Sequence, residues 1–250
     1  MSGHSKWATI KHKKGALDAK RGKLFTKLIR EMTIAARLGG GETETNPRLR
    51  TAVDKAKAGN MPADNIKRAI QKGAGALEGE TWEDIIIEGY GPGGVAVLVE
   101  GSSDNRNRTV SEIRHIFSKH GGNLGTAGSV GYLFKQRGFL AIAREKVSEE
   151  RLMEIALEAG ADDIQSAADN WEVYTPPNAY EPVLGALRQA GLEPEASQIG
   201  KYADINITLE GGKAQQMLKM IEALEDNDDV QNVWANFDVS DKELEEAAAR

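Results

Sequence analysis

The chain has 250 residues, with 32 Lys and Arg, 38 Asp and Glu, and a formal net charge of −6. It contains no cysteine, which excludes disulfides, thiolate nucleophiles and cysteine-ligated zinc or iron–sulfur centres. No apolar run approaches the roughly 18 residues that indicate a membrane span, and 40% hydrophobic residues with a mean hydropathy of −0.46 indicate a soluble protein with packed cores. An acidic total argues against a nucleic-acid partner only if the charge is evenly spread.

Positive and negative charges are segregated along the chain. Residues 1–37 carry ten Lys and Arg against Asp18 and Glu31, a local net charge of +8 that leaves −14 on the other 213 residues. Such a division is typical of a basic arm that binds a polyanion and an acidic body that is repelled by it. The alternative interpretation is a solvated, Lys-rich amphipathic helix.

The first 80 residues are predicted to form a tail and three helices. Residues 1–15 have little to bury and are expected to be extended, and helical periodicity runs from about residue 16 to the glycines at 39–41. Its apolar residues share one side, except for Ile34, and Lys20, Lys23, Lys27 and Arg30 lie on the other. A second helix is predicted to begin at Asn46-Pro47, with Asn46 as its N-cap and Pro47 in its first turn, and to end at about residue 59. A third is predicted from 61–62 to 73, with Ile66, Ala69 and Ile70 facing inward. A glycine-rich linker follows at 73–79.

After the linker, short β patterns alternate with helices. Strands are predicted at 84–90, 95–101 and 130–134. A helix is predicted at 109–120, with Val110, Ile113 and Phe117 on its apolar face. The order strand, helix, strand, strand, helix, strand then follows at 139–143, 149–159, 163–167, 171–175, 180–190 and 195–200, which is the order of a ferredoxin-like unit. A strand at 204–209, a helix at 212–224 and a strand at 230–237 complete the chain before a short C-terminal tail at 241–250.

These elements predict an α+β fold with three domains. The N-terminal domain covers residues 1–80. Residues 81–135 and 201–240 form a discontinuous α/β domain, and residues 136–200 form a ferredoxin-like α/β domain inserted into it. Three sequential pieces are the alternative, but they would leave two half-sheets with uncovered edges.

The tail holds the residues with the clearest chemical meaning. Lysines neutralise phosphates and release counterions, and an indole among them can stack on an unpaired base. Two histidines at positions 4 and 12 have a spacing that matches no defined metal site, so no metal is expected. The candidate nucleic-acid-binding residues of the tail and the first helix are Lys6, Trp7, Lys11, His12, Lys13, Lys14, Lys20, Arg21, Lys23, Lys27 and Arg30.

A second basic cluster begins before the helix at 109–120. Arg106 and Arg108 are candidates for phosphate contact there, with capping and salt bridges to neighbouring carboxylates as the equally weighted alternative. The cluster continues through Arg114, His115, Lys119 and His120.

The glycine-rich loop at 89–94 resembles a phosphate-binding loop only superficially. It leads into a strand rather than a helix, and Pro92 has no N–H to donate. The sequence therefore favours a tight hairpin turn, and a phosphate-handling enzyme built on this loop is the alternative. No nucleophile–base pair or convergent carboxylates are recognisable, so we expect no enzyme and no cofactor.

The ordered motifs resemble those of the YebC/PmpR family. They run from residue 3 to about 134: Gly3-His4-Ser5-Lys6-Trp7, Asp18-Ala19-Lys20-Arg21-Gly22-Lys23, Asn46-Pro47-Arg48-Leu49-Arg50, Asn60-Met61-Pro62, the loop Glu88–Gly94, the stretch Asp104–Thr109 and the segment Phe117–Gly125. The resemblance implies an N-terminal helical domain and two α/β domains, one inserted in the other. It also implies a bacterial, cytoplasmic protein, since the first motif leaves no room for a transit peptide.

The resemblance implies a DNA-binding transcriptional regulator. Relatives that include a mitochondrial translational activator imply an alternative, a ribosome-associated factor that binds ribosomal RNA through the tail and assists synthesis of proline-rich stretches. The expected partner is nucleic acid, DNA or ribosomal RNA, with the ribosome as a further partner and neither a membrane nor a small-molecule substrate. The Lys-rich helices favour backbone contact over base readout. A scaffold whose acidic domains bind protein is a further alternative.

Overall fold

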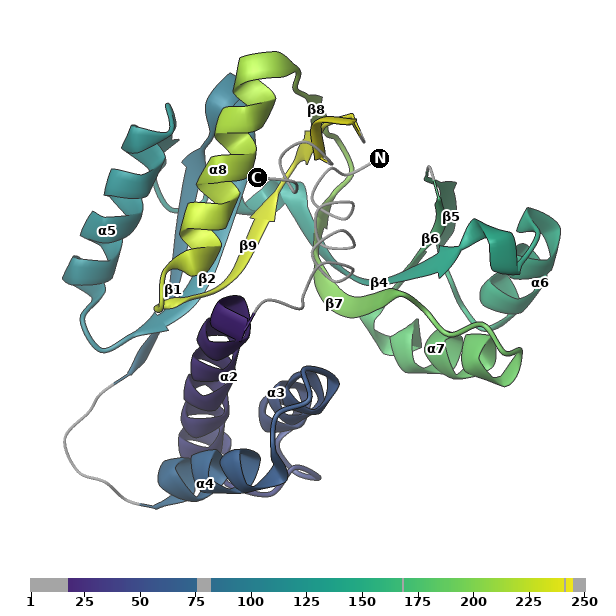
Figure 1. Ribbon diagram of the computed structural model, residues 1–250, viewed down its shortest axis with the longest axis horizontal. Coiled ribbons are helices and arrows are strands. Elements are labelled where there is room, and N and C mark those ends of the chain that lie inside the picture. Colours follow the sequence, from purple (N-terminus) through teal and green to yellow (C-terminus); the bar gives the residue numbers. More distant parts are fainter. Residues whose placement is uncertain (1–17, 76–81, 168, 241, 245–250) are drawn as a thin grey trace.

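The computed structural model describes residues 18–75, 82–167, 169–240 and 242–244, with side chains from residue 22 onward. Three groups of elements are arranged around the centre of the molecule (Figure 1). We call them the helical unit, the central unit and the inserted unit. No helix within the described ranges is both long enough and apolar enough to cross a membrane.

The helical unit consists of α2 (Asp18–Gly39), α3 (Pro47–Ala58) and α4 (Ala63–Ala74). Its core is formed by the apolar sides of the three helices, including Met32, Leu49 and Ala56, which are fully buried. Of the predicted inward positions of α4, Ile66 and Ala69 are buried in this core, and Ile70 packs against it partly buried. Burial of these stripes, and not helix propensity alone, is what holds such short helices together.

Asn46 begins α3 as predicted, and it does more than cap the helix. Its side-chain oxygen accepts the backbone N–H of Leu49 at 3.1 Å. Its amide nitrogen donates to the backbone carbonyls of Ala35 at 2.7 Å and Gly40 at 2.8 Å. Asn46 is only 5% exposed, so one buried side chain ties the start of α3 to the last turn of α2.

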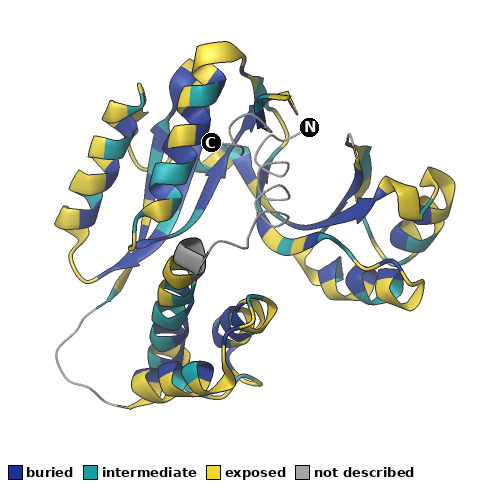
Figure 2. Cartoon of the chain, in the orientation of Figure 1, coloured by how far each residue is buried: buried dark blue, intermediate teal, exposed yellow. Residues whose placement is uncertain are grey.

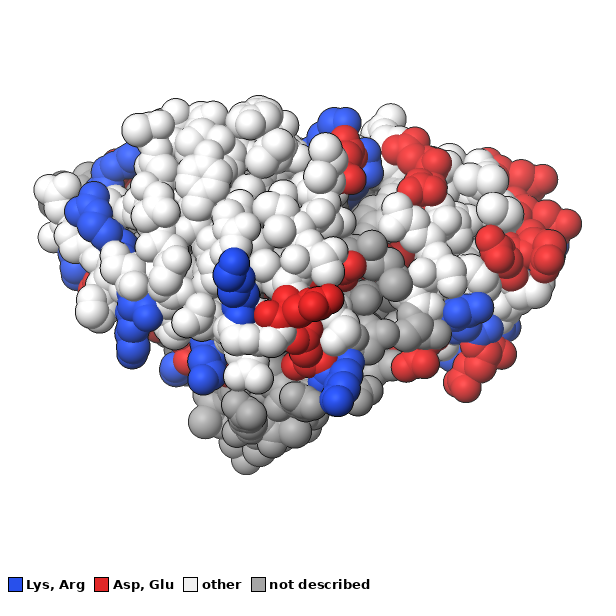
Figure 3. Space-filling view, turned by 90° about the horizontal axis from the view of Figure 1, so that it is seen from above, with Lys and Arg blue, Asp and Glu red and all other residues white. Residues whose placement is uncertain are grey.

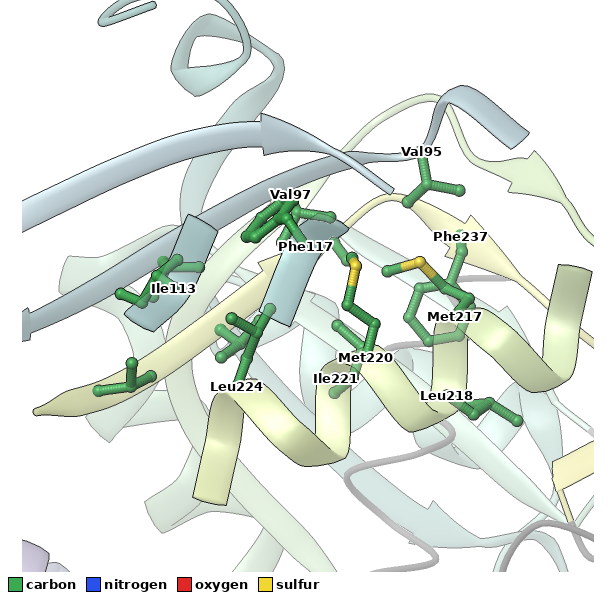
Figure 4. Close-up of a cluster of buried hydrophobic side chains, with 14 of the residues drawn as sticks. Val95, Val97, Ile113, Phe117, Met217, Leu218, Met220, Ile221, Leu224 and Phe237 are labelled. Atoms are coloured by element: carbon green, nitrogen blue, oxygen red, sulfur yellow. The ribbon is translucent and has the colours of Figure 1, made fainter. Parts of the chain in front are cut away.

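The central unit is an antiparallel sheet in the order β3-β1-β2-β9, with two helices on one face. Val97 of the sheet lies in one buried cluster with Phe117 of the first helix and with Met217 and Met220 of the second (Figure 4). The other face is covered by a smaller cluster, so β2 is buried on both faces (Figure 2). Its elements are β1 (Glu83–Tyr90), β2 (Ala96–Ser103), α5 (Arg106–Lys119), β3 (Asn123–Leu124), α8 (Gly211–Asp226) and β9 (Val230–Ala235).

The glycine-rich loop is a hairpin turn between β1 and β2, as the sequence favoured. The Gly91 N–H donates to the carbonyl of Val95 at 2.8 Å, and the Gly94 N–H donates to that of Gly91 at 3.1 Å. A short 3-10 turn, Pro92–Gly94, lies between the strands and packs on α8. These two donors are therefore used within the turn.

The inserted unit is an antiparallel sheet in the order β5-β6-β4-β7, the order of a ferredoxin-like fold. Its two helices pack on one face through a core that includes Leu140, Leu152 and Val173. The elements are β4 (Phe134–Ala143), α6 (Glu149–Glu158), β5 (Asp163–Ser166), β6 (Asn170–Thr175), α7 (Tyr180–Gln189) and β7 (Ala196–Ala203). The predicted α+β fold class is thus confirmed.

The strands of the central sheet come from both sides of the segment that forms the inserted sheet. All four strands of the inserted unit lie within residues 134–203, whereas β9 of the central unit follows that segment. We therefore propose the domain division given above, with the inserted domain widened from 136–200 to 134–203.

Two predicted strands have a different form. Residues 130–134 were expected to be a strand, but they form a 3-10 turn, Gly131–Leu133, before β4 begins at Phe134. The reason is that Glu88 takes their donors: its carboxylate accepts the N–H groups of Val130 at 2.6 Å and Gly131 at 2.7 Å. The strand expected at 204–209 shrinks to β8 (Ile207–Thr208), which pairs with β10 (Phe237–Asp238).

Replacing Asn46 by Ala should destabilise the helical unit by about 2 kcal/mol, because it removes the cap and the side-chain donor to the carbonyls of Ala35 and Gly40, of which the first bond is buried. Urea unfolding followed by far-ultraviolet circular dichroism measures this loss. Thr51→Ala is the matched control, since its hydroxyl is exposed and bonds only the carbonyl of Pro47. Equal midpoints for both variants would contradict the role assigned to Asn46.

Candidate nucleic-acid interface

The predicted contact residues divide into three groups. Those of the tail, Lys6, Trp7, Lys11, His12, Lys13 and Lys14, lie outside the described residues. Lys20 and Arg21 lie in the first turn of α2, but their side chains also lie outside the description. The structure therefore places Lys23, Lys27, Arg30, Arg106 and Arg108.

The basic stripe of α2 lies against the turn between α8 and β9. We call residues 225–229, Glu-Asp-Asn-Asp-Asp, the acidic turn. The ammonium of Lys27 donates to the carbonyl of Glu225 and, at 2.8 Å, to that of Val230. Lys23 pairs with Asp226 at 3.1 Å, with both side chains about half exposed. The described part of the stripe predicted to face phosphates is thus occupied by the protein's own carbonyls and carboxylates.

Arg30 makes the most specific contacts of the stripe. Its guanidinium donates to the carbonyl of Asp228 and to the carboxylate of Asp229, each at 2.7 Å. The same group lies over the ring of Trp82, 4.6 Å from its centroid, which adds a cation–π attraction. Ile34 lies one turn further along the stripe and is 3% exposed. Its burial away from the apolar side of α2 shows that this side of the helix is also covered.

The Asp229 carboxylate is the centre of this interface. Its side chain is 5% exposed, and its second oxygen accepts hydrogen bonds from Arg108 at 2.8 Å and from the hydroxyls of Thr109 and Ser103. One carboxylate therefore connects α2, the start of α5 and the end of β2.

Hydrogen bonding determines the ionisation of Asp229. Burial opposes its charged form, but hydrogen bonds from Thr109 and Arg108 and the charges of Arg108 and Arg30 outweigh burial, so its pKa lies below the ordinary value of 3.8. The group is accordingly a carboxylate at neutral pH, and its single negative charge is shared by two arginine partners.

The backbone of the acidic turn is also fixed to β2. The Ser102 N–H donates to the carbonyl of Asp229 at 2.9 Å. A Cβ on Gly101 would lie 2.1 Å from that carbonyl oxygen, so only glycine allows this approach. A register shift in the β2–β9 pairing occurs at the same point, which is typical of a β-bulge.

A second polar network joins the helical and central units. Arg48 of α3 makes paired hydrogen bonds to Glu31 of α2, at 2.7 and 3.2 Å, and to Asp84 of β1, at 2.8 and 3.0 Å. Ser102 donates to Asp84 at 2.7 Å, and Gln231 donates to Ser102 at 3.0 Å. The hydrogen bond from Arg48 lowers the pKa of Asp84 despite partial burial.

An open hollow of about 460 Å³ lies beside the acidic turn. Two arginines and five carboxylates line it, together with Asn227. Since the carboxylates outnumber the cations, the hollow does not fit a phosphate. The lining residues are Arg30, Asp104, Arg108, Glu112, Asp226, Asn227, Asp228 and Asp229.

The two candidates on α5 have different surroundings. Arg108 bonds Asp104 and Asp229, each at 2.8 Å, which is the salt-bridging role that the sequence left open. Arg106 is exposed at the first turn of the helix. Lys and Arg gather over the α5 end of the molecule, whereas Asp and Glu gather over the inserted unit at the opposite end (Figure 3).

The cations of α3 and α4 were not among the residues that the sequence predicted to contact nucleic acid. Residues 47–74 contain seven Lys and Arg and two Asp, a net charge of +5. On α4, Lys67, Arg68 and Lys72 are exposed, and no acidic side chain in the described ranges comes within 4.0 Å of them. A helical wheel of the sequence could have identified these three cations, because they lie on the side away from the inward residues Ile66 and Ala69.

The chain matches known proteins along its whole length. Residues 82–237 match a family model described as the second and third domain of TACO1/YebC, and residues 5–76 match that of the TACO1/YebC N-terminal domain. A "Probable transcriptional regulatory protein" of Koribacter versatilis is 59% identical across 99% of this chain and 100% of its own length. Another of that name, from Acidobacterium capsulatum, is 58% identical with the same coverage.

One solved structure extends the comparison to the fold. The crystal structure of a conserved hypothetical protein from Aquifex aeolicus matches with a TM-score of 0.77 at 51% identity, over 90% of this chain and 93% of that one. Family models match both the N-terminal helical part and the α/β part of this chain, and the solved structure shares its fold. These matches define the class of protein. This chain belongs to the TACO1/YebC family, as its motifs predicted.

Replacing Asp229 by Ala should lower the free energy of unfolding by about 3 kcal/mol, because two arginines and two buried hydroxyls lose their acceptor. Asp226→Ala is the matched control in the same turn, and its exposed pair with Lys23 should contribute less than about 1 kcal/mol. Calorimetric unfolding of both variants makes the comparison. A loss for Asp226→Ala as large as that for Asp229→Ala would contradict this ranking.

Acidification should weaken the contact between the helical and central units. Asp84 and Asp229 have lowered pKa values in the folded protein. The stability that these two carboxylates contribute to the folded protein is therefore complete above the pKa of an unfolded Asp, near 3.9. It is lost as the pH falls through their lower pKa values in the folded state. Thermal unfolding measured from pH 7 to 2.5 should show this loss, and the double variant Asp84→Asn/Asp229→Asn should show a flatter pH dependence. An unchanged pH profile in that variant would contradict the assignment.

Proposed function

We propose that this protein is a non-enzymatic, nucleic-acid-binding regulator of gene expression that acts in transcription, in the cytoplasm. The observation that carries the proposal is the segregation of charge, +8 on residues 1–37 of a chain whose total is −6. The names of its relatives, probable transcriptional regulatory proteins, support the same role. DNA is the proposed target.

The proposed contact is made first by the tail. Lys6, Lys11, Lys13 and Lys14 supply four positive charges, with Trp7 and His12 among them and no acidic residue in the first 17 positions. Lysines at this density bind phosphates without reading sequence, and the indole adds stacking on an unpaired base. Lys20, Arg21 and Arg106 extend the positive charge.

The α2 stripe can contribute to the proposed phosphate contact only where its cations leave their present partners. Lys27 and Arg30 bond the acidic turn, so a phosphate reaches them only after those contacts break. Lys23 is exposed and weakly paired, and it is therefore the member of the stripe most readily available. Arg108 keeps its carboxylate partners and positions the acidic turn.

Binding rather than catalysis fits the chemistry of the site. The loop that an enzymatic interpretation would need uses the N–H groups of Gly91 and Gly94 within its own turn. No group of three potential metal ligands occurs among the described residues. The same basic tail would also suit structured ribosomal RNA, and the experiment below is designed to separate the two targets.

Crosslinking in cells, followed by sequencing of bound DNA and RNA, tests the proposal. Changing Lys6, Lys11, Lys13 and Lys14 to Ala should remove most of the signal, and changing the same four to Arg, the control that keeps their charge, should retain it. Binding to duplex DNA should also be measured with the purified Ala variant over a range of salt concentrations. In a plot of log K against log salt concentration, its slope should be about 3 to 4 smaller in magnitude than that of wild type.

Each outcome of that experiment bears on the proposal. Discrete DNA sites support transcription as the process. Signal confined to ribosomal RNA would replace transcription with translation at the ribosome. A signal that does not depend on the tail in either pool would overturn the proposed contact surface.

A further inference from the structure

The cations of α4 differ from those of α2 in what surrounds them. Every described cation of the α2 stripe has an acidic or carbonyl partner from the acidic turn. Lys67, Arg68 and Lys72 have no carboxylate within 4.0 Å among the described residues. We call these three residues the α4 face. Like charges at this spacing repel one another weakly, and a bound polyanion would relieve that repulsion.

The α4 face is also held on a rigid support. A Cβ on Gly73 would lie 2.2 Å from the backbone carbonyl oxygen of Thr33, so α2 and α4 cross with their backbones nearly in contact. Ile66 and Ala69 are buried beneath the charged side, and the outward side of the helix is exposed (Figure 2). Three charges are thus presented in fixed positions along a helix about 18 Å long.

The composition of the face selects the class of partner. Residues 47–74 contain no Phe, Tyr or Trp, so the face has no ring to stack on bases. Ile66 and Ala69 of the same helix are buried in the core, so they are not available to insert into a bilayer. Exposed Lys and Arg on a helix suit regularly spaced phosphates, which a duplex supplies at one per about 1.7 Å of axis. The acidic residue on the same exposed side is Asp64.

We propose that the α4 face is a second nucleic-acid contact surface, which binds the phosphodiester backbone of a duplex without reading its sequence. This inference rests on the proposed function and adds to it a surface at the far end of α2 from the tail (Figure 1). The tail anchors the target at one end of α2, and the α4 face fixes its orientation at the other.

The test compares two triple variants of the full chain. Lys67→Ala/Arg68→Ala/Lys72→Ala removes the α4 face. Lys146→Ala/Arg151→Ala/Arg188→Ala removes the same charge from exposed positions of the inserted unit. Circular dichroism and thermal unfolding confirm that both variants are folded.

The measurement is binding to a 20-base-pair DNA duplex and to an RNA hairpin across a range of salt concentrations. The α4 variant should show a log K against log salt slope about 2 to 3 shallower than wild type and, near 0.1 M salt, binding weakened by roughly tenfold or more. The control variant should change the slope by less than about 1. Affinity should fall equally for unrelated duplex sequences, because phosphates are the contacts.

The failures of the two proposals are distinguishable. If wild type binds and the tail variant loses binding, but the α4 variant matches the inserted-unit control, the α4 face is overturned and the proposed function stands. If wild type shows no salt-dependent binding to either nucleic acid, both proposals fail. Sequence-dependent losses in the α4 variant would overturn the assignment to the backbone.

Discussion

The arrangement of the helical and central units depends on one buried carboxylate. Asp229 accepts hydrogen bonds from Arg30 of α2, Arg108 of α5 and the hydroxyls of Thr109 and Ser103. A buried charge is costly unless its lone pairs are satisfied, so the position of Asp229 is tolerable only while all of these elements converge on it. This requirement couples the helix that follows the basic tail to the core of the central unit.

The same contact redistributes the positive charge of the protein. Lys27 and Arg30 bond the acidic turn, and the second network around Arg48 holds α3 against β1. The positive charge left without acidic partners in the described residues therefore includes the outer side of α4. The acidic turn thus has a structural role: it is the docking surface for α2, in addition to keeping this side of the central unit negative.

The elements and their cores were largely predictable, because period and capping are local. The helical wheel correctly placed Ile113 and Phe117 inward, and Asn46 was recognised as a cap. Residues 130–134 could not be predicted correctly, because the donors of Val130 and Gly131 go to Glu88, some forty residues earlier.

What the sequence determined by itself was the fold class, the family and the presence of a basic N-terminal segment, since these depend on composition, periodicity and ordered motifs. What only the tertiary structure decided was which of the basic side chains have acidic partners. Lys27 and Lys67 look alike in sequence, but one lies against the carbonyls of the acidic turn and the other faces outward. Electrostatic pairing is set by distances of a few ångströms between residues some two hundred positions apart, and such distances exist only once the chain has folded.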